Sequence, residues 1–289
     1  MSTAAPDDTP RRRGPSHTLS ARSALLTVLG KFGQPRHEPI WTATLVGAMA
    51  LMGIEEKSAR QALTRVASDG FLVGERQGRR TRWTITETGT AYLDANGDRI
   101  YGFLRDSRLW DGTWLVLAVT VPETQRQLRH HLRTGLLGAG LGSPAPGLWV
   151  TTDRTAVTAA EQVVDDLGIR DKTMSWIGTS APLGDPRVLA ATAWDLDALA
   201  ATYRAFSAEF GRCDPTDPRD AFPDQVRLLH EWRRLVLADP AIPLELLPGD
   251  WPGPDALAVF RRCHEVWNRR ATAVWDELRS AAQISESPS

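Results

Sequence analysis

The most informative segment of this sequence is GIEEKSARQALTRVASDGFLVGERQGRRTRW, residues 53–83. Its first half places small apolar residues at i, i+3, i+4 and i+7, the spacing that gives a helix one buried face. These residues are Ala59, Ala62, Leu63 and Val66. Glycine tolerates the left-handed backbone conformation that ends many helices, so Gly70 is expected to end this one. The segment therefore predicts an amphipathic helix that stops just before the hairpin.

The opposite face of this helix is polar. At roughly 100° per residue it carries side chains that suit base edges, because Arg and Lys pair with guanine, Gln pairs with adenine and Thr contacts a thymine methyl group. The candidate DNA-binding residues on or beside this face are Lys57, Arg60, Gln61, Thr64 and Arg65. The pattern is typical of a helix that enters a DNA major groove. The alternative is an ordinary solvated, charged face.

The second half of the segment has the pattern of a β-hairpin. It alternates as a strand through Phe71 and Val73, turns at Gln77 and Gly78, and returns through residues 82–85. Four arginines gather near its tip, namely Arg76, Arg79, Arg80 and Arg82. A two-stranded wing with this charge is suited to contact phosphates or a minor groove. An arginine-rich turn without a binding role is the alternative.

Two further helices are expected before this segment. Ser20 is a suitable N-cap for a helix that ends at Gly33, and a second helix is expected over residues 42–52. Three helices followed by a hairpin are the order of a winged helix-turn-helix domain, in which the third helix reads DNA. A short helix over residues 86–100 would then lead out of the domain.

From Trp110 the pattern changes to that of a mixed module. The expected elements are a strand over 114–120, a helix from Pro122, a weak strand near Leu141, a strand over 148–151, a helix over 156–167 and a strand over 173–177. The order βαββαβ is that of a ferredoxin-like module. Gly138, Gly140 and Gly142 suggest a nucleotide-binding loop, but they lack the GxGxxG spacing and open no helix.

The remainder is expected to be helical. Asp195 caps a helix that ends at Gly211, a second helix runs over residues 223–238, and a long third helix runs over 255–282. The predicted fold class is therefore α+β and multidomain. Its expected parts are a disordered tail (1–18), a winged helix DNA-binding domain (19–105), a ferredoxin-like domain (106–180), a helical C-terminal domain (181–283) and a disordered end (284–289).

Composition restricts the class of protein. The 289 residues carry a formal net charge of −1, yet residues 20–105 hold 12 basic against 8 acidic residues, whereas residues 181–289 hold 12 against 17. The basic surplus falls on the helix and hairpin described above.

The two cysteines, Cys213 and Cys263, argue against a disulfide framework and for a reducing compartment. No apolar run approaches the ~20 residues of a membrane span and no signal-peptide core is present, so we expect a cytoplasmic protein without a membrane partner.

Several local phrases resemble the PaaX family, repressors of phenylacetate catabolism, and the resemblance covers about residues 20–280. The matching phrases are 23–26 (SALL), 53–54 (GI), 60–66 (RQALTRV), 78–80 (GRR), 99–101 (RIY), 110–114 (WDGTW), 121–123 (VPE), 147–150 (GLWV), 193–196 (AWDL), 230–233 (HEWR) and 239–253 (DPAIPLELLPGDWPG). The C-terminal phrases are the longest and therefore the most specific.

The resemblance implies a homodimeric regulator that represses by binding a palindromic operator. It further implies that an aryl-CoA thioester, typically phenylacetyl-CoA, releases the protein from the DNA, with no cofactor required. Trp194, Trp232 and Trp251 could frame an apolar slot for this effector, with Arg233 and Arg234 near its phosphates. Core tryptophans and solvated arginines are the alternative. The sequence also leaves another acyl-CoA or a free aromatic acid open as the inducer.

The middle domain is similar to the small ferredoxin-like nuclease subunit of CRISPR systems, which makes a metal-dependent nuclease the alternative function. Its first strand carries no acidic residue, and Asp111 just before that strand is the single candidate ligand. A zinc site lacks ligand spacing in the available residues, which are Cys213, His230, Cys263 and His264. No GxSxG motif anchors a hydrolase. We therefore expect a DNA-binding regulator that is not an enzyme.

Overall fold

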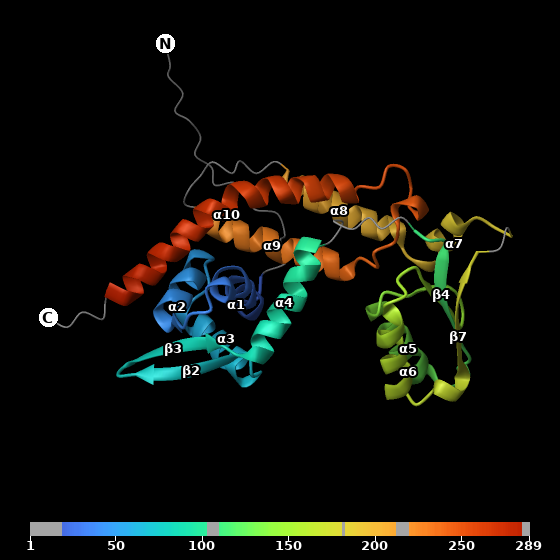
Figure 1. Cartoon of the computed structure of the whole chain (residues 1–289), viewed down its shortest axis with the longest axis horizontal. Coiled ribbons are helices and arrows are strands. Elements are labelled where there is room, and N and C mark those ends of the chain that lie inside the picture. The colour runs from blue at the N-terminus through green and yellow to red at the C-terminus, as the bar shows by residue number, and fades with distance from the viewer. Residues whose placement is uncertain (1–18, 103–109, 181–182, 212–219, 285–289) are drawn as a thin grey trace, which may run out of the picture.

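The computed structural model describes residues 19–102, 110–180, 183–211 and 220–284. The expected tail over 1–18, the last residues 285–289 and Cys213 lie outside these ranges. Helices and two antiparallel sheets make up the described chain, so the fold has the mixed α+β character expected from the sequence. Figure 1 shows the N-terminal helices and hairpin on one side, the central sheet on the other, and long C-terminal helices running above both.

The first helical segment begins at the expected residue but continues beyond Gly33. Ser20 caps α1 (Ala21–Val28), because its hydroxyl accepts a hydrogen bond from a backbone N–H of the first turn at 3.1 Å. Instead of ending at Gly33, the chain continues through a π-helical turn, η1 (Leu29–Gly33), and a 3₁₀ turn, η2 (Gln34–Arg36). Gly33 keeps a right-handed backbone, so the predicted glycine stop is wrong.

Helices α2 (Thr42–Leu51) and α3 (Glu56–Ser68) follow, and Gly70 has a positive φ of 79° just beyond α3. The predicted inner face of α3 is confirmed, since each of its members is buried: Ala59, Ala62, Leu63 and Val66. Small side chains on this face let α3 lie close to α1. The packing leaves the polar face of α3 exposed.

The hairpin strands are β2 (Leu72–Gln77) and β3 (Arg80–Ile85). Their register leaves a two-residue turn over 78–79, one position later than predicted, and Gly78 supplies a positive φ of 59°. A third strand, β1 (Ile40–Trp41), pairs with β3. Two residues give no alternation that a sequence pattern could reveal, so this strand has no signal in the sequence.

Helix α4 (Glu87–Gly102) precedes a central sheet with the order β5-β6-β4-β7, in which every pair is antiparallel. The strands and helices of this part occur in the expected βαββαβ order: β4 (Thr113–Val119), α5 (Arg126–Gly138), β5 (Gly142–Ala145), β6 (Leu148–Thr151), α6 (Ala156–Asp166) and, after the 3₁₀ turn η3 (Arg170–Lys172), β7 (Thr173–Thr179). The first helix starts at Arg126 rather than at Pro122, and the weak strand lies just after Leu141. Helices α5 and α6 cover the sheet face that is turned toward the N-terminal part (Figure 1).

The C-terminal part is helical as expected, with one additional short helix. Its elements are α7 (Pro186–Ala193), α8 (Leu196–Phe210), α9 (Ala221–Ala238), the 3₁₀ turn η4 (Leu244–Leu246) and α10 (Gly253–Ile284). The Asp195 carboxylate caps α8 by accepting a hydrogen bond from the backbone of Ala198 at 2.9 Å, as predicted. None of the described helices combines the length and the apolar character that crossing a membrane demands.

The N-terminal helices share one hydrophobic core with the C-terminal helices. Phe32 lies between Phe222 of α9 and Trp275 of α10, with ring centroids 5.0 and 5.7 Å away. All three side chains are fully buried. Two ion pairs flank these rings: Arg36 with Asp276, and Glu38 with Arg279. The segments that the sequence divides into separate domains are therefore packed firmly against one another.

A buried polar layer separates this core from the core among α8, α9 and α10. Gln225 of α9 is fully buried, and its side-chain nitrogen lies 2.7 Å from Nδ1 of His264 on α10. The side-chain oxygens of Gln225 and Asn268 are buried without a hydrogen-bond partner among the described residues. Burial, and then the charge of Lys31, lower the pKa of His264 to about 4. The two cores thus meet at a layer of neutral polar groups.

The connector between α9 and α10 holds the central sheet against the C-terminal helices. The Tyr203 hydroxyl donates a hydrogen bond to the Asp239 carboxylate at 2.5 Å, and that carboxylate also accepts the backbone N–H of Ala241 at 2.6 Å. The connector's apolar side chains pack with Trp114 of β4 in one cluster: Ile242, Leu246 and Leu247. The sheet is therefore anchored through the motif-rich segment 239–253.

Removing one of the outer rings of this stack should destabilise both parts together. We expect Phe222→Ala to lower the free energy of unfolding by about 3–5 kcal/mol, because it leaves a cavity beside the ring of Phe32 in the shared core. Denaturant unfolding followed by circular dichroism measures the change. Leu237→Ala is the control, since Leu237 lies on the same helix but is 47% exposed. Equal losses in the two variants would contradict the shared core.

Candidate nucleic-acid interface

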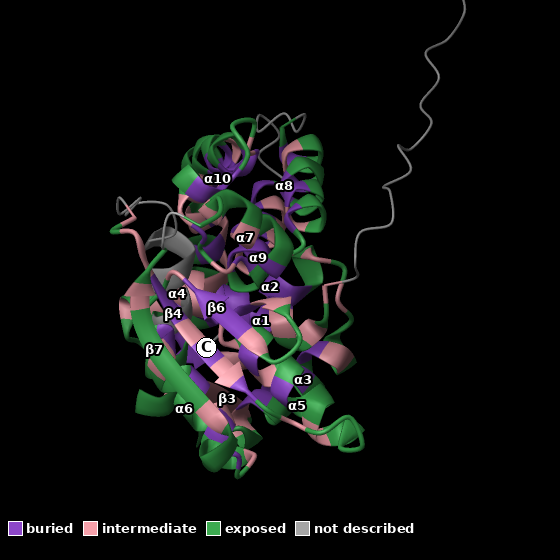
Figure 2. Cartoon of the chain, turned by 90° about the vertical axis from the view of Figure 1, so that its right-hand side faces the viewer, coloured by how far each residue is buried: buried purple, intermediate pink, exposed green. Residues whose placement is uncertain are grey.

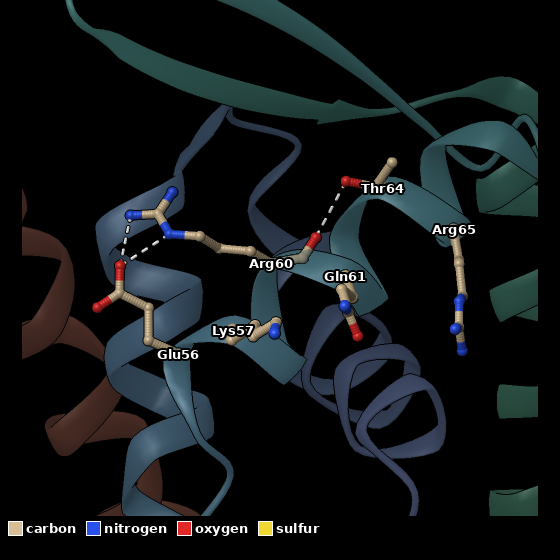
Figure 3. A pocket seen from close by; sticks show the side chains of 6 residues that line it. All are labelled: Glu56, Lys57, Arg60, Gln61, Thr64 and Arg65. Atoms are coloured by element: carbon tan, nitrogen blue, oxygen red, sulfur yellow. Dashed lines mark hydrogen bonds and ion pairs between the residues drawn. The ribbon is translucent and has the colours of Figure 1, made fainter.

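The polar face of α3 lines an open hollow of about 710 Å³. Six exposed side chains of this one helix form it, as Figure 3 shows: Glu56, Lys57, Arg60, Gln61, Thr64 and Arg65. All five α3 residues that the sequence predicts as DNA contacts are among them. One regular helix therefore brings these side chains together, because it buries its opposite face against α1.

The six side chains differ in whether they already make a hydrogen bond or an ion pair within the protein. Glu56 accepts a hydrogen bond from Nε of Arg60 at 2.7 Å, so Arg60 is turned back along the helix in Figure 3. Among the described residues, Lys57, Gln61 and Arg65 have no hydrogen-bond or ion-pair partner. These three side chains are free to meet a ligand without losing an existing contact. The i, i+4 spacing of Glu56 and Arg60 was the available sequence signal for their pairing.

The tip of the β2–β3 hairpin, the wing, presents two exposed arginines. Arg76 donates from Nε to the carbonyl of Gly78 at 3.1 Å, which holds its side chain beside the turn. Arg79 lies in the turn itself and has no partner in the part of the chain that the structure describes. Both guanidinium groups are thus open to solvent. They supply positive charge at the end of the wing.

The other two wing arginines serve the fold. Arg82 donates to Glu75 on the paired strand at 2.9 Å. Arg80 lies 4.3 Å over the ring of Trp41 and donates to the carbonyl oxygen of Ala282 in α10. These contacts hold the wing against β1 and the end of α10. The sequence cannot separate the two kinds of arginine, because Ala282 is 202 residues away from Arg80.

Two of the predicted effector contacts lie where the central sheet meets the C-terminal helices. Trp194 stacks on Trp114 with ring centroids 6.4 Å apart, and its Nε1 is buried without a hydrogen-bond partner among the described residues. Trp251 meets the ring of Tyr203 edge-on at 5.8 Å. Both tryptophans pack against the cluster that contains Leu246. The structure therefore brings this pair into one neighbourhood.

Two further predicted effector contacts, Trp232 and Arg233, lie elsewhere. Trp232 is fully buried among α8, α9 and α10, where it stacks on Phe260 at 4.7 Å. Arg233, the next residue, is half-buried and lies within electrostatic range of Tyr92 on α4 and Arg22 on α1. Burial lowers the pKa of its guanidinium. Adjacent positions on a helix point about 100° apart, which explains why Trp232 and Arg233 do not share one site.

The candidate metal ligand of the central domain, Asp111, is engaged in other contacts. Asp111 accepts hydrogen bonds from the hydroxyl and the backbone of Thr113 at 2.5 and 2.9 Å, and Arg154 lies 3.6 Å away. These contacts, the Thr113 hydroxyl first, lower the pKa of Asp111. Within the described ranges, no group of three or more His, Cys, Asp or Glu residues is arranged to hold a metal ion. Cys263 is buried, and burial raises the pKa of its thiol.

Neighbouring wing arginines should respond differently to substitution. We expect Arg80→Ala to lower the free energy of unfolding by about 1–3 kcal/mol, because it removes a cation–π contact and a charged hydrogen bond to α10. Arg79→Ala, the matched control in the turn, should change it by less than about 0.5 kcal/mol. Thermal or denaturant unfolding of both variants tests this. Equal stability of the two would show that Arg80 does not hold the wing.

Comparisons with known proteins agree on one family. Residues 20–89 match the family described as PaaX-like protein, residues 107–190 the PaaX protein central Cas2-like domain, and residues 194–277 the PaaX-like protein C-terminal domain. The chain is 26% identical over 272 residues to Transcriptional repressor PaaX of Escherichia coli (strain K12), across 88% of this chain and 82% of that protein. A solved structure, the uncharacterized protein Rv0674 from Mycobacterium tuberculosis, is 25% identical with a TM-score of 0.61, across 88% of this chain and 98% of the other. With three successive matches along its length, the chain belongs to the PaaX family.

Proposed function

We propose that this protein is a transcriptional repressor that binds double-stranded operator DNA through a winged helix-turn-helix domain. The observation that carries the proposal is the α3 face, where Lys57, Gln61 and Arg65 are exposed and have no partner among the described residues, beside a wing that ends in Arg76 and Arg79. Family membership supports it, because the related Escherichia coli protein is named a transcriptional repressor. Repression requires only competition for DNA, so no catalytic residue is involved.

The exposed face of α3 suits a major groove. B-DNA's major groove is about 12 Å wide and admits one α-helix, whose side chains then read base edges. Lys57 and Gln61 would read bases, with Arg60 joining them if it exchanges Glu56 for DNA. The wing arginines would contact phosphates, which position the protein but carry no sequence information. Affinity and sequence choice would thus come from two separate groups of side chains.

A homodimer is supported by the free edge of the central sheet. Strand β7 lies at that edge, and three of its apolar side chains are strongly exposed: Met174 at 68%, Trp176 at 50% and Ile177 at 53%. Figure 2 shows exposed residues along most of this strand. An apolar edge strand left open invites pairing with another chain. A second copy related by a two-fold axis would cover both edges at once and place two α3 helices on a palindromic operator.

Release by an aryl-CoA thioester such as phenylacetyl-CoA requires a conformation with a different spacing of the two α3 helices. A ligand that bound both conformations equally would not shift the equilibrium between them. The shared core couples α3 to α9 and α10 through Phe32, Phe222 and Trp275. We place the effector beside Trp194 and Trp251, where the central sheet meets the C-terminal helices. Trp232 and Arg233 lie elsewhere and would not contact the same ligand. Movement of α9 or α10 would then reach the DNA-binding face.

Binding to the DNA upstream of its own gene tests the proposal directly. The full-length protein should bind this fragment specifically, and phenylacetyl-CoA should release it. Gln61→Ala should weaken specific binding by about 1–3 kcal/mol, the value of one base contact. Gln162→Ala, on the exposed surface of α6, is the control and should bind as the wild type does. Fluorescence anisotropy measures the affinity of the wild type, of the wild type with phenylacetyl-CoA, and of each of the two variants.

The outcomes of this experiment separate the parts of the proposal. Absence of any sequence-specific binding would contradict the repressor function. Specific binding that phenylacetyl-CoA leaves unchanged would keep the repressor and exclude this thioester as the inducer. Equal affinities of the Gln61 and Gln162 variants would show that Gln61 does not read a base.

Charge placed on the free sheet edge should dissociate the homodimer. We expect Trp176→Glu to convert the dimer into a monomer, because a carboxylate at the centre of an apolar interface would lose its hydration. Analytical ultracentrifugation at micromolar concentration measures the mass in solution. The control is Leu237→Glu, which adds the same charge to an exposed apolar position of α9. A Trp176→Glu protein that stays dimeric would move the interface away from β7.

A further inference from the structure

A second basic surface lies on α5, outside the proposed reading helix and wing. Four of its side chains recur at i, i+3, i+4 and i+7 and so share one helix face. They are Arg126, Arg129, His130 and Arg133, and all are exposed. The helix contains no acidic residue. We call these four residues the α5 basic face.

The charges of the α5 basic face are hardly neutralised. In the part of the chain that the structure describes, Arg126 and Arg133 have no hydrogen bond or ion pair. Arg129 lies 4.0 Å from Glu123, whose carboxylate is 95% exposed, so this contact is at the limit of an ion pair. Exposed arginines on other elements pair more closely, as Arg170 does with Asp165 at 2.8 Å. An ordinary solvated face carries both signs of charge, which α5 does not.

The most similar exposed arginines lie on α10 and differ in their surroundings. Arg261 and Arg269 are exposed and have no ion pair among the described residues. However, Glu265 lies midway between them at i+4 spacing and places a negative charge on the same face. Unbalanced positive charge therefore gathers on α3, on the wing and on α5.

The α5 basic face lies on the same side of the molecule as the proposed reading helix. Figures 1 and 2 both place α3 and α5 on the side opposite α8 and α10. In addition, α5 and α6 cover the face of the central sheet that is turned toward the N-terminal part (Figure 1). Both basic helices therefore lie on one side of the C-terminal helices α8 and α10.

We propose that the α5 basic face binds phosphates of the same DNA duplex, beside the half-site that α3 reads. This inference rests on the proposed function and adds a second contact surface to it. Arg126 and Arg133 are seven residues apart, about 10.5 Å along the helix. Since each DNA strand carries one charge per about 3.4 Å of its axis, the two guanidinium groups can reach separate phosphates. The contact adds affinity that depends on salt and not on base sequence.

The test compares two matched double variants of the full-length protein. R126Q/R133Q removes two arginines from the α5 basic face, and R261Q/R269Q removes two exposed arginines from α10. Affinity for the fragment upstream of the protein's own gene is measured over a series of salt concentrations. Each lost phosphate contact should reduce the slope of log affinity against log salt by about 0.9, so R126Q/R133Q should reduce it by about 1.8. R261Q/R269Q should keep the wild-type slope.

A footprint and a charge-retaining variant complete the experiment. DNase protection by R126Q/R133Q should shorten at the flanks of the half-sites while the half-sites stay protected. R126K/R133K should restore the slope, because lysine keeps the positive charge. Thermal unfolding of each variant should match the wild type, since all four substituted side chains are exposed.

Each result has a distinct meaning. A wild-type protein without specific DNA binding contradicts the proposed function itself. A wild type that binds, together with R126Q/R133Q that keeps its slope and footprint, overturns the inference and leaves the reading helix in place. Equal slope losses in R126Q/R133Q and R261Q/R269Q also overturn it, because they would reflect net charge and not a contact at α5.

Discussion

The aromatic stack of Phe32, Phe222 and Trp275 is the contact on which the arrangement of the chain depends. It joins η1, the turn that continues α1, to α9 and α10, and α3 in turn rests on α1 through small side chains. Protein interiors are close-packed, so α9 or α10 cannot shift without moving α1 or opening a void. The position of the α3 face is therefore determined by helices that lie more than 150 residues later in the sequence.

The polar layer beside this stack gives the same helices a second property. Gln225 and His264 meet there, and buried oxygen atoms of Gln225 and Asn268 have no partner among the described residues. A buried polar atom without a hydrogen bond costs free energy, so the layer is held less strongly than the apolar cores on either side of it. Helices α9 and α10 thus pack tightly against the N-terminal part, while the polar layer near their middle contributes less to stability.

The arginines of this protein fall into two groups, those that contact other groups of the fold and those that project into solvent. Arg80 and Arg82 are held by a tryptophan ring, a helix carbonyl and a carboxylate, and they stabilise the wing. Arg65, Arg79 and the α5 basic face project into solvent, and the described residues offer them little or no compensating negative charge. A protein with a formal net charge of −1 can therefore present a basic surface toward DNA, because its acidic surplus lies in the C-terminal residues.

The sequence by itself determined most of the long elements and the inner face of α3, but neither β1 nor α7. Helical periodicity predicted α3 and its buried residues, an apolar run predicted β4, and a capping aspartate predicted the start of α8. These signals are local, because period and capping depend on residues within one or two turns. Only the tertiary structure decided that Phe32 meets Phe222, that Arg80 reaches Ala282 and that Trp232 and Arg233 point to different surroundings. A periodic pattern tells which face of an element is buried, but the identity of the partner depends on the packing of segments far apart in the chain.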